Sequence, residues 1–239
     1  MTDWQAVRDV YGSAADIPAL LRDAASTNDW DARAWQELWG RLYHQGSVAP
    51  ASYVALPALA EIAASRADVA LDPALFLAAA IISSNDGPPE IDGVRGRYAA
   101  ELALLRPVAA RKLALVSDRG DVLWALQVVA ALEDLSPWQR HLEGLAGEEL
   151  ELECPLCDDH IFLEFLGGTL VATADPDAAG RGVPVQAAAS DGLDSGEARL
   201  LTLCQEYGKA AVAGELLQLF GRASCPYCRA SFSIARAWA

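Results

Sequence analysis

The chain has 239 residues, enough for one domain and a small additional module. Hydrophobic residues make up 53% of it, and their excess lies in Ala and Leu rather than in β-branched residues, which favours helices over sheets. The 33 acidic side chains against 18 basic ones give a net charge of −15, which disfavours binding to nucleic acid or an anionic membrane and favours a basic protein partner.

Nothing in the sequence pattern predicts export or membrane insertion. The chain begins Met-Thr-Asp-Trp-Gln, without the cationic region and apolar core of a signal peptide. Its longest apolar stretch, 74–82, is much shorter than the about 20 residues that cross a bilayer. We therefore expect a cytoplasmic protein without a membrane segment, in which thiols stay reduced and can bind a metal.

Residues 1–146 carry the pattern of helices that come in neighbouring pairs. Apolar side chains recur at helical spacing over 17–24 and, after a break at 26–28, again over 35–42. A third helix is predicted over 50–64, because proline suits the first turn and the apolar residues that follow form one stripe.

The next predicted helix is the most apolar one. Asp72 followed by Pro73 is typical of a helix cap and first helical residue, and 75–82 is apolar nearly all round, as in a helix buried at the centre of a core. Further helices are predicted over 94–116 and 121–132. Because antiparallel helix pairs bury their faces by stacking on the next pair, the order predicts a mainly α region built as a solenoid.

The pattern changes after Gly147, where residues 147–239 predict a small α+β module. Charged and apolar residues alternate in short runs, which indicates a small sheet. The stretch 175–197 is rich in Asp, Gly and Ala, has no periodicity, and is predicted to be a mobile insertion. The predicted strands are 149–153, 161–165, 169–173 and 232–235, and the two predicted helices are 197–207 and 209–220.

Two Cys-x-x-Cys turns carry the strongest chemical signal. They are Cys154-Pro-Leu-Cys157 and Cys225-Pro-Tyr-Cys228, and this spacing lets both sulfurs of a tight turn face one cation. Four thiolates suit Zn²⁺, which has a tetrahedral habit in structural sites. We therefore predict one structural zinc ion per chain at Cys154, Cys157, Cys225 and Cys228, with the apolar residues Ile161 and Phe232 packed at the same offset behind each turn.

Two other uses of these cysteines stay open. Buried or disulfide-bonded pairs are disfavoured by a reducing compartment. Cys-Pro-Tyr-Cys is also the active-site string of glutaredoxins, but such a site needs its first cysteine at a helix start near the beginning of a βαβ unit, whereas Cys228 lies near the end of the sequence. Residues 158–224 separate the two turns, which is long for a zinc-ribbon-like module. The predicted strands, the insertion and the two predicted helices must therefore lie between the turns.

Several other residues have ordinary structural explanations. Cys204 lies in an apolar helical stripe and is predicted to be a core residue. His44 stands at a predicted helix end, where an imidazole can bond the last carbonyl groups. Trp35 and Trp39 are one helical turn apart and are predicted to fill the core, which leaves Trp30 as the exposed one.

Polar groups near the cysteines and in the helices are weaker candidates. Residues 158–160, Asp-Asp-His, are predicted to form a solvated turn, because four sulfurs already complete the metal shell. An enzyme with a site in the helical groove would use carboxylates such as Glu37 or Glu61, but no catalytic motif is recognisable. Nucleic-acid binding would need more than the three cations near the second turn, which are Arg222, Arg229 and Arg236.

The string Trp-Gln-Glu-Leu-Trp-Gly-Arg-Leu-Tyr-His-Gln-Gly over 35–46, with Ala-Pro-Ala-Ser at 49–52 and Leu-Pro-Ala-Leu at 56–59, resembles bacterial HEAT-like repeat proteins. In those, a tryptophan-containing helix ends in His-Gln-Gly and a proline-bent helix follows. The stretches 153–157 and 219–228 are similar to a cysteine-bearing part found after such repeats. One departure is Ala-Pro-Ala at 49–51, where the family typically has Tyr-Pro-Ala.

This resemblance implies a HEAT-like solenoid used for protein contact, and some proteins of this kind resemble immunity partners of secreted bacterial toxins. It implies no enzymatic activity. Together with the charge, it leads us to expect a non-enzymatic, protein-binding scaffold with a structural zinc site, acting as an immunity-type or regulatory partner of a basic protein. The alternatives are an enzyme with a groove site and, less favoured, a thiol redox protein.

Overall fold

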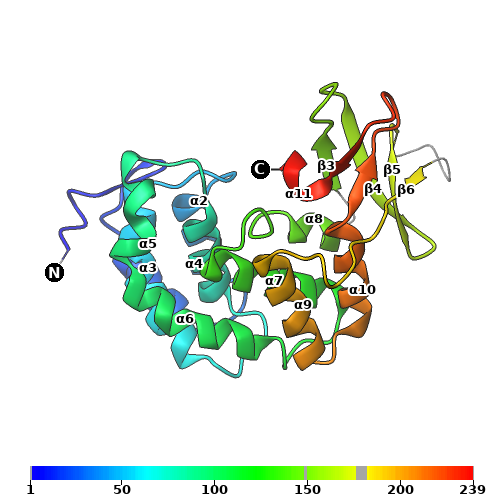
Figure 1. Ribbon diagram of the computed structural model, residues 1–239. Coiled ribbons are helices and arrows are strands. Elements are labelled where there is room, and N and C mark those ends of the chain that lie inside the picture. The colour runs from blue at the N-terminus through cyan, green and yellow to red at the C-terminus, as the bar shows by residue number, and fades with distance from the viewer. Residues whose placement is uncertain (1, 148–149, 176–181, 239) are drawn as a thin grey trace. The chain divides into compact units, whose positions relative to one another are not determined.

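The computed structural model describes residues 2–147, 150–175 and 182–238, with the side chains of residues 90 and 91 left aside (Figure 1). Proximity of Cα atoms groups the chain into two compact units. The first unit comprises 1–116 and 131–134, and the second comprises 117–130 and 135–239. The first is mostly helical, whereas the second combines helices with a small antiparallel β region.

The first unit begins with a short β hairpin and continues with helices. Its elements are β1 (Arg8–Asp9), β2 (Gly12–Ser13), α1 (Ile17–Ala24), α2 (Arg33–Leu42), α3 (Pro50–Ser65), α4 (Pro73–Ser83), the 3-10 helix η1 (Pro89–Gly93), α5 (Val94–Arg97) and α6 (Ala99–Lys112). The predicted helix over 94–116 is thus divided at Tyr98, whose backbone leaves the helical region. The next helix, α7 (Arg119–Glu133), belongs to the second unit up to residue 130 and to the first beyond it.

Helix α4 is the most completely buried helix segment of the first unit. Asp72 caps it, because its Oδ1 accepts hydrogen bonds from the N–H groups of Ala74 (3.0 Å) and Leu75 (3.1 Å), and Pro73 takes the first helical position. Nearly every residue of the helix is buried. The apolar run therefore forms the buried helix that the sequence predicts.

The arrangement of helices in the first unit centres on α3. This helix packs against α2, α4 and α6 and also meets β1. In a solenoid, each helix pair would contact only the pairs before and after it. No solenoid is detected in the described part of the chain, so the HEAT-like repeat stays a prediction.

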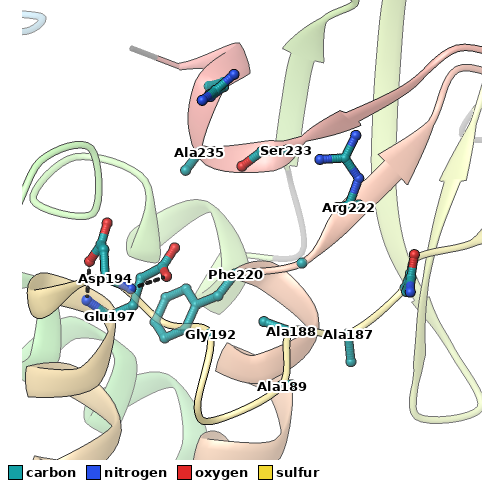
Figure 2. A pocket seen from close by; sticks show the side chains of 13 residues that line it. Ala187, Ala188, Ala189, Gly192, Asp194, Glu197, Phe220, Arg222, Ser233 and Ala235 are labelled. Atoms are coloured by element: carbon teal, nitrogen blue, oxygen red, sulfur yellow. Dashed lines mark hydrogen bonds between the residues drawn. The ribbon is translucent and has the colours of Figure 1, made fainter.

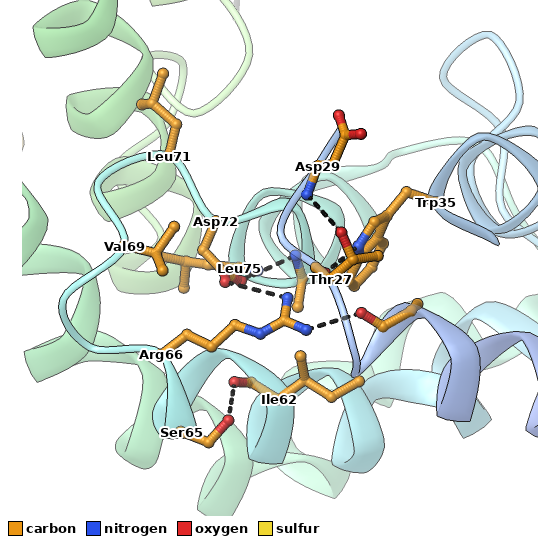
Figure 3. Close-up of polar contacts among 12 residues, drawn as sticks. Thr27, Asp29, Trp35, Ile62, Ser65, Arg66, Val69, Leu71, Asp72 and Leu75 are labelled. Atoms are coloured by element: carbon orange, nitrogen blue, oxygen red, sulfur yellow. Dashed lines mark hydrogen bonds and ion pairs between the residues drawn. The ribbon is translucent and has the colours of Figure 1, made fainter. Parts of the chain in front are cut away.

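A buried ionic cluster ties the loop after α3 to α4 and α6, and Figure 3 shows Arg66 and Asp72 of this cluster facing each other. Asp72 is fully buried, and its Oδ2 lies 3.6 Å from Nη1 of Arg66. Arg66 Nη2 donates to the carbonyl of Ala24 at 2.8 Å. Lys112, only 1% exposed, donates to the carbonyls of Arg66 (2.6 Å) and Val69. We name Arg66, Asp72 and Lys112 the ionic cluster.

Within its described residues, the second unit contains a four-stranded antiparallel sheet, a separate β hairpin and four helices besides its part of α7. The sheet has the order β3 (Leu150–Glu153), β4 (His160–Leu166), β5 (Thr169–Thr173), β6 (Val183–Pro184). The hairpin pairs β7 (Arg222–Ser224) with β8 (Ser231–Ser233). The helices are α8 (Leu142–Gly147), α9 (Ser195–Glu206), α10 (Ala210–Leu219) and α11 (Ile234–Ala237).

The chain just after β6 connects the sheet with the hairpin. Gln186 and Arg222 exchange two backbone hydrogen bonds, of 3.0 and 2.9 Å. Their approach requires Gly221, because a Cβ atom at this position would lie 2.1 Å from the carbonyl oxygen of Gln186. The sequence pattern missed β7, and the last predicted strand is wrong beyond Ser233, where α11 begins instead.

The segment 175–197, predicted to be a mobile insertion, is bonded into the second unit along much of its described part. Residues 182–197 include β6, the exchange at Gln186, a hydrogen bond from the N–H of Ala188 to Leu217, and the start of α9. Backbone pairing of this kind needs no hydrophobic periodicity, so the composition did not reveal it. Residues 176–181 lie outside the described residues.

Helix α8 and part of α7 belong to the same compact unit as the cysteine-bearing region. Division into independently folding domains at residues 146 and 147 stays a prediction. No helix among the described residues is long and apolar enough to cross a membrane. A cytoplasmic location also stays a prediction.

Candidate metal centre

Two β hairpins present the four cysteines. The turn between β3 and β4 carries Cys154 and Cys157, and the turn between β7 and β8 carries Cys225 and Cys228. We call these turns the first and second knuckle. Each is anchored at its base by an antiparallel strand pair, which fixes the direction from which its sulfurs approach.

The two knuckles have the same backbone hydrogen bonds. In the first, the N–H of Cys154 donates to Asp159 and the N–H of Asp158 donates back to the carbonyl of Cys154, both at 2.9 Å. The second knuckle repeats both bonds, at 2.9 and 3.1 Å, with Cys225, Ala230 and Arg229. Asp158 and Arg229 are equivalent and both left-handed, with φ of 58° and 66°. Two Cys-Pro-x-Cys strings far apart in the sequence thus fold into one local geometry.

The four sulfurs converge on one position. All four Sγ atoms lie within 4.8 Å of one another, with Cys154 to Cys228 at 3.8 Å and Cys157 to Cys225 at 3.7 Å. Tetrahedral Zn–S bonds of about 2.3 Å place sulfurs about 3.8 Å apart. A disulfide requires about 2.05 Å, and all the cysteines are free. The set can therefore hold a metal ion, and its all-sulfur donors favour zinc.

Burial differs along the set of ligands. Cys154 and Cys225, the first cysteine of each knuckle, are fully buried, whereas Cys157 is half-buried and Cys228 is exposed. Behind the knuckles, Ile161 (0% exposed) and Phe232 (6%) are both buried, as their equal offsets predict. Four sulfurs leave no open coordination position, which is typical of structural rather than catalytic zinc.

In the absence of a cation, the thiols do not all ionise together. Burial acts to raise the pKa of Cys154, but hydrogen bonds from the N–H groups of Leu156 and Cys157 and from the thiols of Cys157 and Cys225 outweigh it, and the pKa is lowered. A hydrogen bond from the N–H of Asp159 acts to lower the pKa of Cys157, yet burial and the neighbouring thiols raise it. Burial also raises the pKa of Cys225. A divalent cation would let all four ionise together.

The tryptophans and His44 lie in the first unit. Trp35 is fully buried, as predicted. Trp39, predicted to fill the core, and Trp30, predicted to be exposed, are both half-buried. Their rings stack at 5.9 Å, and Trp30 Nε1 donates to the carbonyl of Leu71. The ring of His44 forms a hydrogen bond through Nδ1 with the hydroxyl of Tyr11, at 3.2 Å. Among the described residues, it forms none of the predicted hydrogen bonds with the last carbonyl groups of α2.

The carboxylates considered for a groove enzyme do not form a pair. Glu37 accepts a hydrogen bond from Arg33 at 2.6 Å, one helical turn away on α2, and Glu61 is exposed on α3. Cys204 is fully buried on α9, as predicted, and burial raises its pKa to about 12. None of these groups joins the cysteine set.

The polar residues near the knuckles are solvent-exposed. Asp158, Asp159 and His160 form the exposed side of the first knuckle, with His160 Nε2 lying 3.8 Å from Glu153. The three cations Arg222, Arg229 and Arg236 are exposed as well. The acidic turn thus lies beside the cysteines without completing their shell.

Sequence reasoning missed a second feature of the knuckles. The residue before the second cysteine is a large exposed apolar one in both: Leu156 is 68% exposed and Tyr227 is 48% exposed. The signal was the third position of each Cys-Pro-x-Cys string, where a tight turn points a side chain outward.

Comparisons of the chain with models of protein families, with curated proteins and with solved structures return no match.

Proposed function

We propose that this protein is a non-enzymatic scaffold that binds a basic protein, with a C-terminal module folded around one structural zinc ion. The observation that carries the zinc assignment is the convergence of four sulfurs with tetrahedral separations. A HEAT-like character of the helical region and an immunity-type or regulatory role belong to this proposal.

Charge supports a basic partner. The net charge of −15 favours association with a cationic surface, and complementary fields raise association rates and select partners. On the first hairpin, four acidic side chains are exposed: Glu151, Glu153, Asp158 and Asp159. They lie on the hairpin that presents Leu156, so an apolar anchor and an acidic rim occur together. This combination matches the apolar core and polar rim of protein interfaces.

The first experiment measures metal by mass spectrometry on protein purified without added metal. We expect about one zinc per chain, because four thiolates complete one tetrahedral shell. The double variant Cys225→Ser with Cys228→Ser should lose the metal, and Cys204→Ser should keep it, because Cys204 lies outside the set. Metal-free protein with reversibly oxidising thiols would overturn the structural site and favour thiol redox chemistry.

The second experiment tests partner binding by affinity capture at low and high salt. A basic partner should be retained at low salt and released at high salt, since screening weakens exposed charge pairs. Leu156→Ser with Tyr227→Ser should weaken capture while zinc content stays unchanged. Leu104→Ser with Leu115→Ser is the matched control, because these side chains are also exposed, at 44% and 47%, but belong to the first unit. Absence of any protein retained at low salt would contradict the scaffold proposal.

A further inference from the structure

A polar hollow in the second unit lies apart from the four sulfurs (Figure 2). Its walls are the chain over 186–192, the start of α9, the beginning of β7 and the start of α11. Its volume of about 640 Å³ falls within the roughly 300–1,000 Å³ that is usual for small-molecule sites. The hollow is therefore large enough for a small ligand.

Backbone contacts fix two of these walls. The exchange of hydrogen bonds between Gln186 and Arg222, made possible by Gly221, holds one wall. At the start of α9, Asp194 Oδ1 accepts from the N–H of Glu197 (2.8 Å), and Glu197 Oε2 accepts from the N–H of Asp194 (3.1 Å). This capping box holds both carboxylates in place before any ligand arrives.

Opposite charges line the hollow without neutralising each other. Figure 2 shows Asp194 and Glu197 on one side and Arg222 on the other. Arg236 lines it too and makes no side-chain hydrogen bond or ion pair with the described residues. Among those residues, no carboxylate of the hollow lies within ion-pair distance of either guanidinium.

The buried acid needs a cationic partner most. Glu197 is only 7% exposed, and burial raises its pKa, which means that its charged form gains from a cation placed beside it. Arg222 already donates to Ser231, through Nε to the hydroxyl (3.3 Å) and through Nη2 to the carbonyl (2.9 Å), which orients its guanidinium. Between the charges, the ring of Phe220 and small alanine side chains supply an apolar floor.

We propose that this hollow binds a small amphoteric molecule, with its ammonium group at Asp194 and Glu197 and its carboxylate at Arg222 and Arg236. A simple anion would meet two carboxylates, and a simple cation would meet two guanidiniums. A single molecule that carries both charges can satisfy both walls at once. A free amino acid and a short peptide with open termini share this chemistry.

The proposal stands apart from the proposed scaffold function. None of its contacts involves a cysteine or a knuckle tip, although β7 and β8 also carry the second knuckle. The test therefore uses the full chain with its zinc content verified. Ligand binding can then fail while zinc and protein binding persist, and the reverse can also occur.

The protein is titrated with four compounds: free alanine, Ala-Ala, N-acetyl-Ala-Ala and Ala-Ala amide. Calorimetry measures the affinity of each, and the NMR shifts of backbone amides show where it binds. We expect shifts at Gly192, Gly221 and Ser233, and binding at least about tenfold weaker when either end of the dipeptide is blocked. Free alanine against Ala-Ala distinguishes the amino-acid source from the peptide source.

Two charge variants assign the walls. Glu197→Gln keeps an acceptor for the capping box but removes the charge, so affinity for Ala-Ala should fall at least about tenfold while the fold persists. Its control is Glu206→Gln, exposed near the other end of α9. Arg236→Met should weaken Ala-Ala binding but leave Ala-Ala amide unaffected, and Arg111→Met, on an exposed arginine elsewhere, should change neither.

Three results would overturn the proposal. One is absence of binding by alanine and Ala-Ala at millimolar concentration. Another is equal binding of the open and blocked dipeptides. The third is binding that Glu197→Gln and Arg236→Met leave unchanged, which would place the ligand outside the hollow.

Discussion

Each compact unit gathers ionisable groups in one place, but only one of the two clusters supplies its own counter-charges. In the first unit, the carboxylate of Asp72 lies beside the cation of Arg66, and Lys112 donates to nearby carbonyls. In the second unit, four thiols with the same charge when ionised face one another. The first cluster is complete within the chain, whereas the second requires a cation from outside.

Metal removal should separate the two units most sharply. A chelator, or Cys225→Ser with Cys228→Ser, should unfold the knuckles, because structural zinc contributes about 10–16 kcal/mol of apparent binding free energy in small zinc modules. The helices of the first unit should persist. Hydrogen exchange measured by mass spectrometry would report each unit separately, and retention of knuckle protection without metal would contradict the comparison.

Asp72→Ala should destabilise the first unit and leave the metal centre of the second unit intact. It removes the cap of α4 and leaves the buried cations Arg66 and Lys112 without their carboxylate, at a cost of about 3–5 kcal/mol in the free energy of unfolding. Chemical denaturation measures this loss, and zinc content should not change. Glu61→Ala, at an exposed position of α3, should change stability little.

Two glycines of the second unit offer a paired test of its backbone packing. Gly221→Ala would place a Cβ atom 2.1 Å from the Gln186 carbonyl oxygen and should destabilise the unit by about 1–3 kcal/mol or more. Gly214→Ala, inside α10 with open space around it, should stabilise the unit by about 0.5–1 kcal/mol. Thermal unfolding of the zinc-loaded variants would give both signs, and a Gly221→Ala variant as stable as the unmodified chain would contradict the close approach at Gly221.

A further effect is a pH dependence carried by His141. Its ring stacks on Trp238 at 4.3 Å, and burial together with Arg140 lowers its pKa to about 4. The neutral ring therefore contributes stability that is full above about pH 6.5 and is lost as the pH falls through about 4, worth about 1–2 kcal/mol after allowance for partial exposure.

His141→Phe should flatten the stability curve between about pH 6.5 and 4 relative to the unmodified chain. His160→Phe is the matched control, because His160 is exposed. Stability measured at each pH with zinc content recorded separates this effect from acid release of the metal. Identical slopes for the unmodified chain and His141→Phe would exclude a role for this ring.

Local signals in the sequence predicted local features well. The Asp72-Pro73 cap with its apolar run gave a buried helix, and the two Cys-x-x-Cys strings marked all four cysteines that converge. Short elements escaped prediction: β6 has two residues, and β7 has three, too few for any periodicity to register. The shift from strand to helix at Ile234 escaped for the same reason.

The sequence by itself determined which residues can chelate a metal and which helix must be buried, because turn spacing and apolar content act over a few neighbouring residues. Only the tertiary structure decided that Cys154 meets Cys228 and that Lys112 reaches the loop after Arg66. Contacts of this kind join distant segments, and they form only when the intervening strands and helices have packed. The pairing of the two knuckles was predicted from their equal cysteine spacing, whereas the charge-lined hollow could not be read from local patterns.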